Sequence, residues 1–371
     1  MQAVVLKAFG EPLAIEDAPD PVIGTGEVLV EVAAAPVLSY ADEVFGGARN
    51  YILPTPCIPG CSAIGRVRAV GPDATKLQPG DWVFVDPTVR SRDDVLMPDI
   101  TLQGWSARGE GGRKLQRYHH DGPFADLVRA PTENVFPIGA IAPEEAGTWC
   151  AINTLLVPYG GLLAIGLQAG ETLLVSGATG NFGSAAVATA LAMGARCVVA
   201  PGRNEAVLAD LRRRFGPRVA PVRLTGDATI DGAAMQAAPG PIDAVLDLMP
   251  PEVDATVVRT AVMTVRPYGR VVLMGGVGML GGSDLALPYP WLMRNLITVR
   301  GQWMCSREAV PGMVGLVRSG LLDLGQYAVT PFPLAEVNAA VAHAAAHGGP
   351  FRLTVLCPER SEGRGQSARA A

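Results

Sequence analysis

A glycine-rich segment in the middle of the chain has the residue types and spacing of a nucleotide-binding turn. Gly177, Gly180 and Gly183 follow the apolar run Thr172–Ser176 and precede an alanine-rich stretch that is typical of a helix. Such glycines allow a tight turn and a close approach of the backbone to a pyrophosphate, and the start of the helix supplies free N–H groups. A glycine turn without a ligand is the alternative, but the strand-and-helix context favours a bound dinucleotide.

The end of the next apolar run indicates which dinucleotide would be bound. Cys197–Ala200 is followed by Pro201-Gly202-Arg203-Asn204, with no acidic residue before Glu205. NAD sites usually place an Asp or Glu here for the ribose 2′-hydroxyl, whereas NADP sites place an Arg near the 2′-phosphate. The sequence therefore predicts NADP(H) with Arg203 as the phosphate partner. NAD(H) is the alternative cofactor, and a solvated arginine at a helix start is the alternative role of Arg203.

Two patterns of apolar residues divide the chain into regions that would position these groups. Up to about Pro143, short alternating runs with Gly and Pro between them predict strands and turns. Beyond it, continuous apolar runs alternate with helical stretches, which indicates a parallel sheet covered on both faces. The 371 residues also exceed what one hydrophobic core usually holds, so two domains are expected.

Composition and charge exclude several classes of function. Hydrophobic residues make up 49% of the chain and charged residues 18%, which fits a folded, enzyme-like protein. The formal net charge of −5 gives no basic face for nucleic acid. The start lacks a signal-peptide pattern and no apolar run reaches the length of a membrane span, so we expect a cytoplasmic protein. The 6 cysteines show no regular spacing that would predict a disulfide framework or a zinc ribbon.

Several short motifs, in this order, resemble those of the medium-chain dehydrogenase/reductase superfamily. They are Gly26-Glu27-Val28-Leu29-Val30, Pro59-Gly60-x-x-Ala63-x-Gly65-x-Val67, Pro79-Gly80-Asp81-Trp82-Val83, Gly122-Pro123-Phe124-Ala125-Asp126, Gly269–Gly275 and Asn295–Gly301. The resemblance implies an α/β fold, in which a GroES-like β-rich catalytic domain is interrupted by an inserted Rossmann domain with a doubly wound parallel sheet. It also implies a homodimer that pairs through Asn295–Gly301.

The same resemblance supplies domain boundaries. It places the first part of the catalytic domain at 1–150, the NADP-binding Rossmann domain at 151–303, the returning segment of the catalytic domain at 304–357 and a disordered polar tail at 358–371. The segment 90–121 is expected to be a long loop or lobe, either a plain surface insertion or a wall of the substrate pocket. Trp105 would line that wall or be buried against the β domain.

The sequence lacks most of the ligands that form the catalytic zinc site in many members of this superfamily. The resemblance places Ser39 where the first cysteine ligand belongs and Cys61-Ser62 where a His-Glu pair belongs. Cys150 alone occupies a ligand position. Because a tetrahedral zinc site needs three or four nitrogen or sulfur ligands, we expect no zinc. An alcohol dehydrogenase with an unconventional metal site built on Cys61 and Cys150 is the alternative.

Without zinc, the chain resembles the quinone oxidoreductases and the enoyl and carbonyl reductases. This implies hydride transfer from NADPH to a small quinone, α,β-unsaturated carbonyl or related carbonyl, with hydrogen-bond donors meeting the negative charge that develops on oxygen. The candidate catalytic residues are Tyr40, Tyr51, Tyr118, His119 and Asn153. The alternative role of Tyr40 is packing. The alternative for His119 and His120 is that they are an exposed pair of loop residues. A cofactor-binding protein without turnover is a third hypothesis.

The resemblance also extends the expected cofactor contacts beyond the glycine turn. The full expected set is Thr154, Ser176, Gly177, Ala178, Thr179, Gly180, Asn181, Phe182, Gly183, Arg203, Gly275, Gly276, Met304 and Arg352. Of these, Arg352 could instead be a surface ion-pair residue.

Overall fold

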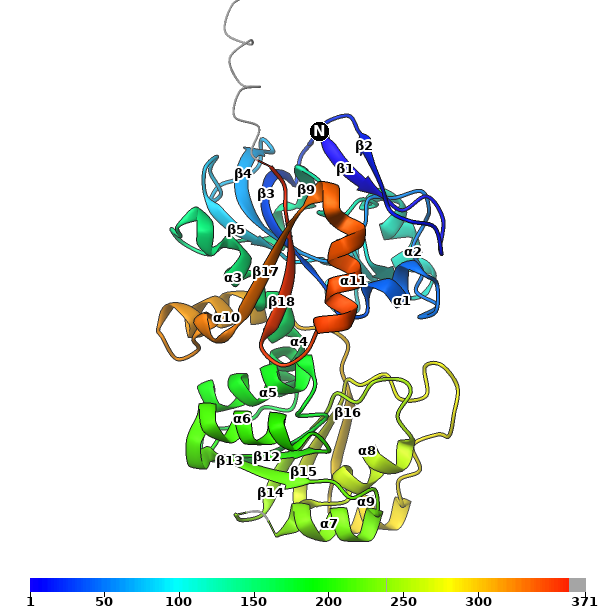
Figure 1. The fold of residues 1–371 in the computed structure, drawn as a ribbon, viewed down its shortest axis with the longest axis vertical. Coiled ribbons are helices and arrows are strands. Elements are labelled where there is room, and N and C mark those ends of the chain that lie inside the picture. Colours follow the sequence, from blue (N-terminus) through cyan, green and yellow to red (C-terminus); the bar gives the residue numbers. More distant parts are fainter. Residues whose placement is uncertain (238, 360–371) are drawn as a thin grey trace, which may run out of the picture. The chain divides into compact units, whose positions relative to one another are not determined.

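The computed structural model describes residues 1–237 and 239–359 of the chain, which form two compact units (Figure 1). The first contains Met1–Cys150, Val329–Gly348 and the chain from Leu353, and the second contains Ala151–Ala328 and Gly349–Arg352. The expected disordered tail lies, from residue 360, outside the described residues. Within the described ranges, no helix is long and apolar enough to cross a membrane.

The first unit is rich in β-strands. Its strands are β1 (Gln2–Val5), β2 (Ala14–Asp17), β3 (Glu27–Val37), β4 (Ala63–Val70), β5 (Trp82–Val85), β6 (Thr88–Arg90), β7 (Ile100–Leu102), β8 (Ser106–Ala107), β9 (Leu127–Pro131), β10 (Val135–Pro137), β17 (Ala328–Pro333) and β18 (Arg352–Cys357). Its helices are α1 (Ala41–Phe45), α2 (Gly109–Tyr118), α3 (Ala146–Trp149) and α11 (Val337–His347), with 3₁₀ turns at Thr132–Asn134, Pro143–Glu145 and Leu334–Glu336.

The long strand β3 organises this unit. It pairs antiparallel with β4, β9 and β18 in a seven-stranded sheet of order β10-β5-β4-β3-β18-β17, from which β9 branches at β3. Gly65 lets β4 approach β3 closely, because a Cβ there would collide with the Glu31 carbonyl oxygen. The returning chain therefore completes a sheet that begins about 320 residues earlier, as the inserted-domain arrangement requires.

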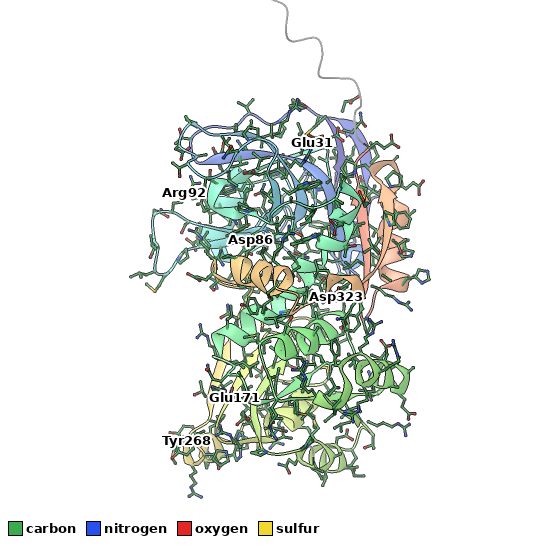
Figure 2. The ribbon with its side chains drawn as sticks, turned by 90° about the vertical axis from the view of Figure 1, so that its left-hand side faces the viewer. Glu31, Asp86, Arg92, Glu171, Tyr268 and Asp323 are labelled. Carbon is green, nitrogen blue, oxygen red and sulfur yellow. The ribbon has the colours of Figure 1, made fainter. Side chains whose placement is uncertain are left out.

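The segment 90–121 is an ordered lobe and not an irregular loop. Its core is the three-stranded sheet β6-β7-β8 with α2 packed beside it. Arg92, labelled at the surface of this unit in Figure 2, ties the lobe to the main sheet. Its Nη2 donates to the Gly26 carbonyl and its Nε to Oε1 of Glu133, both at 2.8 Å. Trp105 is only 2% exposed, so burial against the β domain, one of its two expected roles, is what the structure shows.

The second unit alternates strands and helices. Its elements are α4 (Ala151–Ala164), β11 (Thr172–Ser176), α5 (Asn181–Ala192), β12 (Cys197–Gly202), α6 (Glu205–Phe215), a 3₁₀ turn (Gly216–Arg218), β13 (Val219–Arg223), α7 (Ala228–Gln236), β14 (Ile242–Asp247), α8 (Ala255–Val262), β15 (Val265–Leu273), α9 (Tyr289–Arg294), β16 (Thr298–Gly301), α10 (Ala309–Arg318) and a 3₁₀ turn (Leu324–Gln326).

Six parallel strands form its sheet in the order β13-β12-β11-β14-β15-β16. Figure 1 shows α5 and α6 on one face and α7 and α8 on the other. Because both faces are covered, β11 is buried along its whole length, which explains its continuous apolar sequence. The strand order reverses between β11 and β14, and in such sheets ligands bind beyond the carboxyl ends of the strands at that point.

The chain between Met304 and Ala328 packs with the second unit, although the sequence places the return to the catalytic domain at 304. Two glycines explain why. A Cβ at Gly160 of α4 would lie 2.6 Å from the Met304 carbonyl oxygen, and a Cβ at Gly312 of α10 would lie 2.6 Å from the Tyr159 hydroxyl. These contacts bring α10 against α4, so the segment stays with the Rossmann sheet until β17.

Candidate cofactor and substrate sites

The glycine turn joins β11 to α5, and each of its glycines has a different role. Gly177 has φ +89°, a left-handed conformation that strains other residues. Gly183 lies so close to the turn that a Cβ would collide with the Gly177 carbonyl oxygen. Gly180 is exposed, is the N-cap residue of α5, and its N–H donates to the Gly177 carbonyl at 2.9 Å. The turn therefore presents bare backbone at the carboxyl end of β11.

The start of α5 is open to an anion. No side chain caps the helix at Gly180. The first N–H groups of any helix lack partners within it, so here they can donate to an oxyanion such as a pyrophosphate. Asn181 and Phe182 lie in this first turn and are partly exposed, whereas Ala178 is fully buried beneath it. These positions are compatible with a dinucleotide phosphate, and their contact with it stays a prediction.

A buried carboxylate supports the glycine turn from below. Ser176 donates from its hydroxyl to Asp247 Oδ1 at 2.8 Å, and the backbone N–H groups of Met249 and Gly275 also bond to this carboxylate. Burial raises the pKa of Asp247 to about 6 in spite of these hydrogen bonds. Gly275 is required for the approach, since a Cβ there would lie 2.5 Å from Asp247 Oδ2. Gly276 follows it, and its N–H donates to the Met249 carbonyl.

The other expected cofactor residues, and the catalytic candidate Asn153, are spread over the second unit. Asn153 and Thr154 are both buried on the first turn of α4. Arg203 directly follows β12 and is exposed. Met304 has φ +59° and is held through its carbonyl, which accepts a hydrogen bond from Gln302 Nε2 at 3.2 Å. Arg352 is the exposed first residue of β18. Their places are compatible with cofactor binding, which stays a prediction for each of them.

In the first unit, the structure brings Tyr40 and Tyr51 together. Their ring centroids lie 6.5 Å apart, and both rings pack edge-on against Trp105, at 5.9 and 6.4 Å. Burial raises the pKa of both phenols, and a side-chain hydrogen bond between the two residues raises the pKa of Tyr40 further and lowers that of Tyr51. Burial outweighs the second effect, so the pKa of Tyr51 is raised overall.

A half-buried arginine packs against this pair. The Arg49 guanidinium lies 4.8 Å from the centroid of the Tyr40 ring, and its Nε donates to Glu43 Oε2 at 2.6 Å. Its side chain is only 15% exposed. The positive charge opposes the burial effect on the pKa of both tyrosines. The arrangement is an aromatic pair with one cation packed beside it.

Tyr118 and His119 form a separate group. The Tyr118 hydroxyl donates to Glu27 Oε1 at 3.1 Å, and the Arg129 guanidinium lies 5.0 Å from its ring centroid. Burial, with the nearby Arg129 charge, lowers the pKa of His119 to about 4, so this imidazole is neutral near pH 7. The side-chain contacts of this group are with Glu27, Arg129 and between the two rings, and Tyr40 and Tyr51 belong to the separate cluster around Trp105.

Both halves of this arrangement match known protein families. Residues 24–140 match the family of the alcohol dehydrogenase GroES-like domain, and residues 182–319 match the family described as zinc-binding dehydrogenase. The chain belongs to the medium-chain dehydrogenase/reductase superfamily and, like its homologues, is an NAD(P)H-dependent oxidoreductase. This confirms the expected α/β fold and the expected nicotinamide cofactor.

Particular relatives within the superfamily differ in activity. Acryloyl-coenzyme A reductase of Metallosphaera sedula is 26% identical over 86% of this chain and 90% of its own length. An alcohol dehydrogenase of Rhizobium meliloti is 34% identical, over 52% of this chain and 55% of its own length. The solved alcohol dehydrogenase of Thermus sp. ATN1 superposes with a TM-score of 0.80 over 97% of this chain and all of its own at 21% identity, which shows the shared fold.

The superfamily's zinc cage does not fit the residues present here. Cys61 is buried, and burial and the neighbouring Asp86 raise the pKa of its thiol; Figure 2 labels Asp86 in the same unit. Burial, with the neighbouring Cys357 thiol, raises the pKa of Cys150, and a hydrogen bond with the backbone of Ile64 opposes this shift. Ser39 packs against Gly348. Among the described residues, no group of three or more His, Cys, Asp or Glu side chains could hold a metal ion.

Sequence reasoning missed three supporting residues. Arg49 and Asp247 carry no motif of their own, and only their contacts reveal that they hold the tyrosine pair and the glycine turn. Gln116, buried on α2, donates from Nε2 to the Ile52 carbonyl at 3.0 Å and so fixes the backbone next to Tyr51. One signal was present for Asp247, because this acid follows the apolar residues Ala244–Leu246 at the carboxyl edge of the sheet.

Proposed function

We propose that this chain is a zinc-independent, NADPH-dependent reductase that transfers a hydride to a quinone, an α,β-unsaturated carbonyl or a related carbonyl. The observation that carries the proposal is the pair Tyr40–Tyr51, which stands beside Cys61 where other members hold zinc. A hydroxyl donor can meet a developing oxyanion without a metal. Arg203, in place of an acidic residue after β12, supports the choice of NADPH.

Bound NADPH supplies the hydride, and the chain's own residues supply orientation and a proton. The glycine turn holds the pyrophosphate, and Asp247 keeps the strand ends that carry it in register. The Tyr51 hydroxyl donates to the substrate oxygen and gives up its proton as the acceptor is reduced by two electrons. Tyr40 donates to Tyr51 and so stabilises the phenolate that remains until solvent restores the proton.

Two observations favour an activated alkene as the acceptor. The match to an acryloyl-coenzyme A reductase extends over most of both chains, and that protein's name states reduction of an enoyl thioester. The shorter match to an acryloyl-coenzyme A reductase of Sulfurisphaera tokodaii is also 26% identical. In such a substrate, the thioester oxygen would accept the hydrogen bond from Tyr51.

The exposed edge of the parallel sheet supports a homodimer. Among the described strands, β16 pairs with β15 alone, and all four of its residues are exposed. Unpaired edges of this kind readily pair with a second strand, and a twofold axis would bring together two copies of β16. We therefore place the dimer contact at Asn295–Gly301. Neither nucleic acid nor a membrane is expected as a partner, and the cytoplasm is the expected location.

A titration of the pure protein with NADPH and with NADH, following nicotinamide fluorescence, tests the cofactor. Turnover is then measured with an enoyl thioester, a quinone, an enone and an aldehyde. We expect NADPH to bind more tightly and at least one acceptor to be reduced. If neither cofactor bound, the proposal would be wrong. Tight NADPH binding without turnover on any acceptor would favour a binding protein instead.

A further inference from the structure

The carboxyl ends of β12 and β13 place a second arginine beside the predicted 2′-phosphate position. Arg223, the last residue of β13, is the Cα partner of Gly202, the last residue of β12. The Leu224 N–H donates to the Gly202 carbonyl at 2.9 Å, so the two chains remain together just beyond the strands. Arg203 follows Gly202 directly. Two arginines therefore leave the sheet at one point of its edge.

This point lies against the glycine turn. A Cβ at Gly202 would collide with the side chain of Thr179, the residue before Gly180. The end of β12 is thus in direct contact with the turn that receives the pyrophosphate. A ribose attached to that pyrophosphate would extend towards Arg203 and Arg223, because β12 is the neighbour of β11 on this side of the sheet.

The charged side chains at this edge of the sheet are exposed, and the ion-pair partner of Arg223 can be replaced by a ligand. Arg223 Nε contacts Glu205 Oε1 at 2.5 Å, and the two side chains are 71% and 65% exposed. Exposed pairs of this kind are weak, so a phosphate dianion can replace the carboxylate. Arg203 is exposed and has no ion pair or hydrogen bond of its side chain within the structure as described. Together they offer two planar donor groups to one phosphate.

We propose that Arg223 binds the 2′-phosphate of NADP(H) together with Arg203, and that Glu205 holds Arg223 near the strand end when no phosphate is present. This inference rests on the NADP(H) preference proposed above. It assigns cofactor specificity to the end of β13 as well as to the end of β12. Glu205 is the first residue of α6 and lies two residues after Arg203. Its contact with Arg223 therefore keeps Arg223 close to Arg203.

Two small ligands that differ by the phosphate alone test this site. Calorimetric titration with adenosine 2′,5′-bisphosphate and with 5′-AMP isolates the 2′-phosphate from the rest of the cofactor. We expect the unmodified protein to bind the bisphosphate more tightly. Arg203→Gln and Arg223→Gln should each weaken bisphosphate binding roughly ten- to hundredfold, as expected for a lost charged hydrogen bond, and leave 5′-AMP binding unchanged.

The matched control is Arg213→Gln. Arg213 belongs to the same unit, is 71% exposed like Arg223 and also contacts an acid, Asp210, but it lies on α6 away from the strand ends. It should change neither affinity. Arg223→Lys, which keeps the charge and loses the planar donor group, should give an intermediate affinity, and its thermal melting checks that the fold is retained.

The outcomes separate this inference from the proposed function. Unchanged bisphosphate binding in Arg223→Gln, with a loss in Arg203→Gln, would overturn the role of Arg223 and leave the reductase proposal intact. Equal binding of the two ligands by the unmodified protein would overturn the whole phosphate site. Failure to bind NADPH and NADH alike would contradict the proposed function itself.

Discussion

The Ser176 hydroxyl donates to Asp247 Oδ1 over 2.8 Å, and this bond joins the carboxyl ends of two adjacent parallel strands. The carboxylate is 3% exposed and also bonds to the backbone after β14 and β15. One side chain therefore holds together the three turns that surround the predicted pyrophosphate position. Because this acid is so deeply buried, its titration should change how the free energy of unfolding depends on pH.

Asp247 should destabilise the folded protein as the pH rises. Its folded-state pKa of about 6 lies above the reference value of 3.8, so the folded chain binds this proton more tightly than the unfolded chain does. The free energy of unfolding of the native protein should therefore fall, relative to Asp247→Asn, between about pH 4 and pH 6, by roughly 3 kcal/mol at most. Urea unfolding of both proteins from pH 4.5 to 8 measures this. A constant difference would contradict the burial effect.

Gly183→Ala should weaken cofactor binding. A Cβ there collides with the Gly177 carbonyl oxygen, so the turn and α5 must move apart. We expect NADPH affinity to fall by roughly tenfold or more, with a loss of stability of about 1–3 kcal/mol. Gly180→Ala is the matched control for stability, because its φ of −87° suits alanine and its Cβ meets only the Gly177 oxygen at 3.3 Å. Similar losses of stability in both variants would refute this account of the turn.

Tyr51→Phe should remove the proton donor. We expect kcat to fall by roughly 10²- to 10⁴-fold with the best acceptor, while NADPH affinity stays unchanged. Tyr40→Phe should have a smaller effect, because Tyr51 keeps its own hydroxyl. The exposed Tyr268, labelled in Figure 2, provides the control substitution Tyr268→Phe, which should leave kcat unchanged. Full activity of Tyr51→Phe would assign the proton to another group.

Zinc should be absent from the active protein. Elemental analysis of the purified enzyme should find much less than one equivalent, and dialysis against a chelator should leave kcat unchanged, because Cys61 and Cys150 have different neighbours. Cys150→Ser should also retain activity. Stoichiometric zinc that is lost together with activity would instead support the alcohol dehydrogenase alternative.

A charge on strand β16 should disrupt the proposed dimer. Val299 lies on this edge strand and is 37% exposed. Val299→Lys should place two like charges close to the twofold axis and shift the protein to the monomer at micromolar concentration, as measured by sedimentation velocity. Val22→Lys, at a valine that is 83% exposed in the other unit, is the control. A native protein that sediments as a monomer would contradict the dimer.

Local pattern was enough to predict the elements and the class of fold. The glycine turn could be found in the sequence because Gly177 has a left-handed φ and Gly183 approaches the Gly177 carbonyl, only a few positions earlier in the chain. The parallel sheet could be found because strands buried on both faces are apolar throughout. The lobe at 90–121 was harder, since its three strands have only two or three residues each and leave little periodicity to detect.

The sequence by itself determined that a dinucleotide-binding unit follows a β-rich unit, and that the usual zinc ligands are replaced. Only the tertiary structure decided which candidates act together: Tyr40 meets Tyr51 under the charge of Arg49, whereas Tyr118 is bound to Glu27. It also decided that Asp247 supports a turn 70 residues earlier in the chain, with Ser176 as its partner. The physical reason is that such contacts depend on how strands are ordered and packed, and residue spacing does not encode that order.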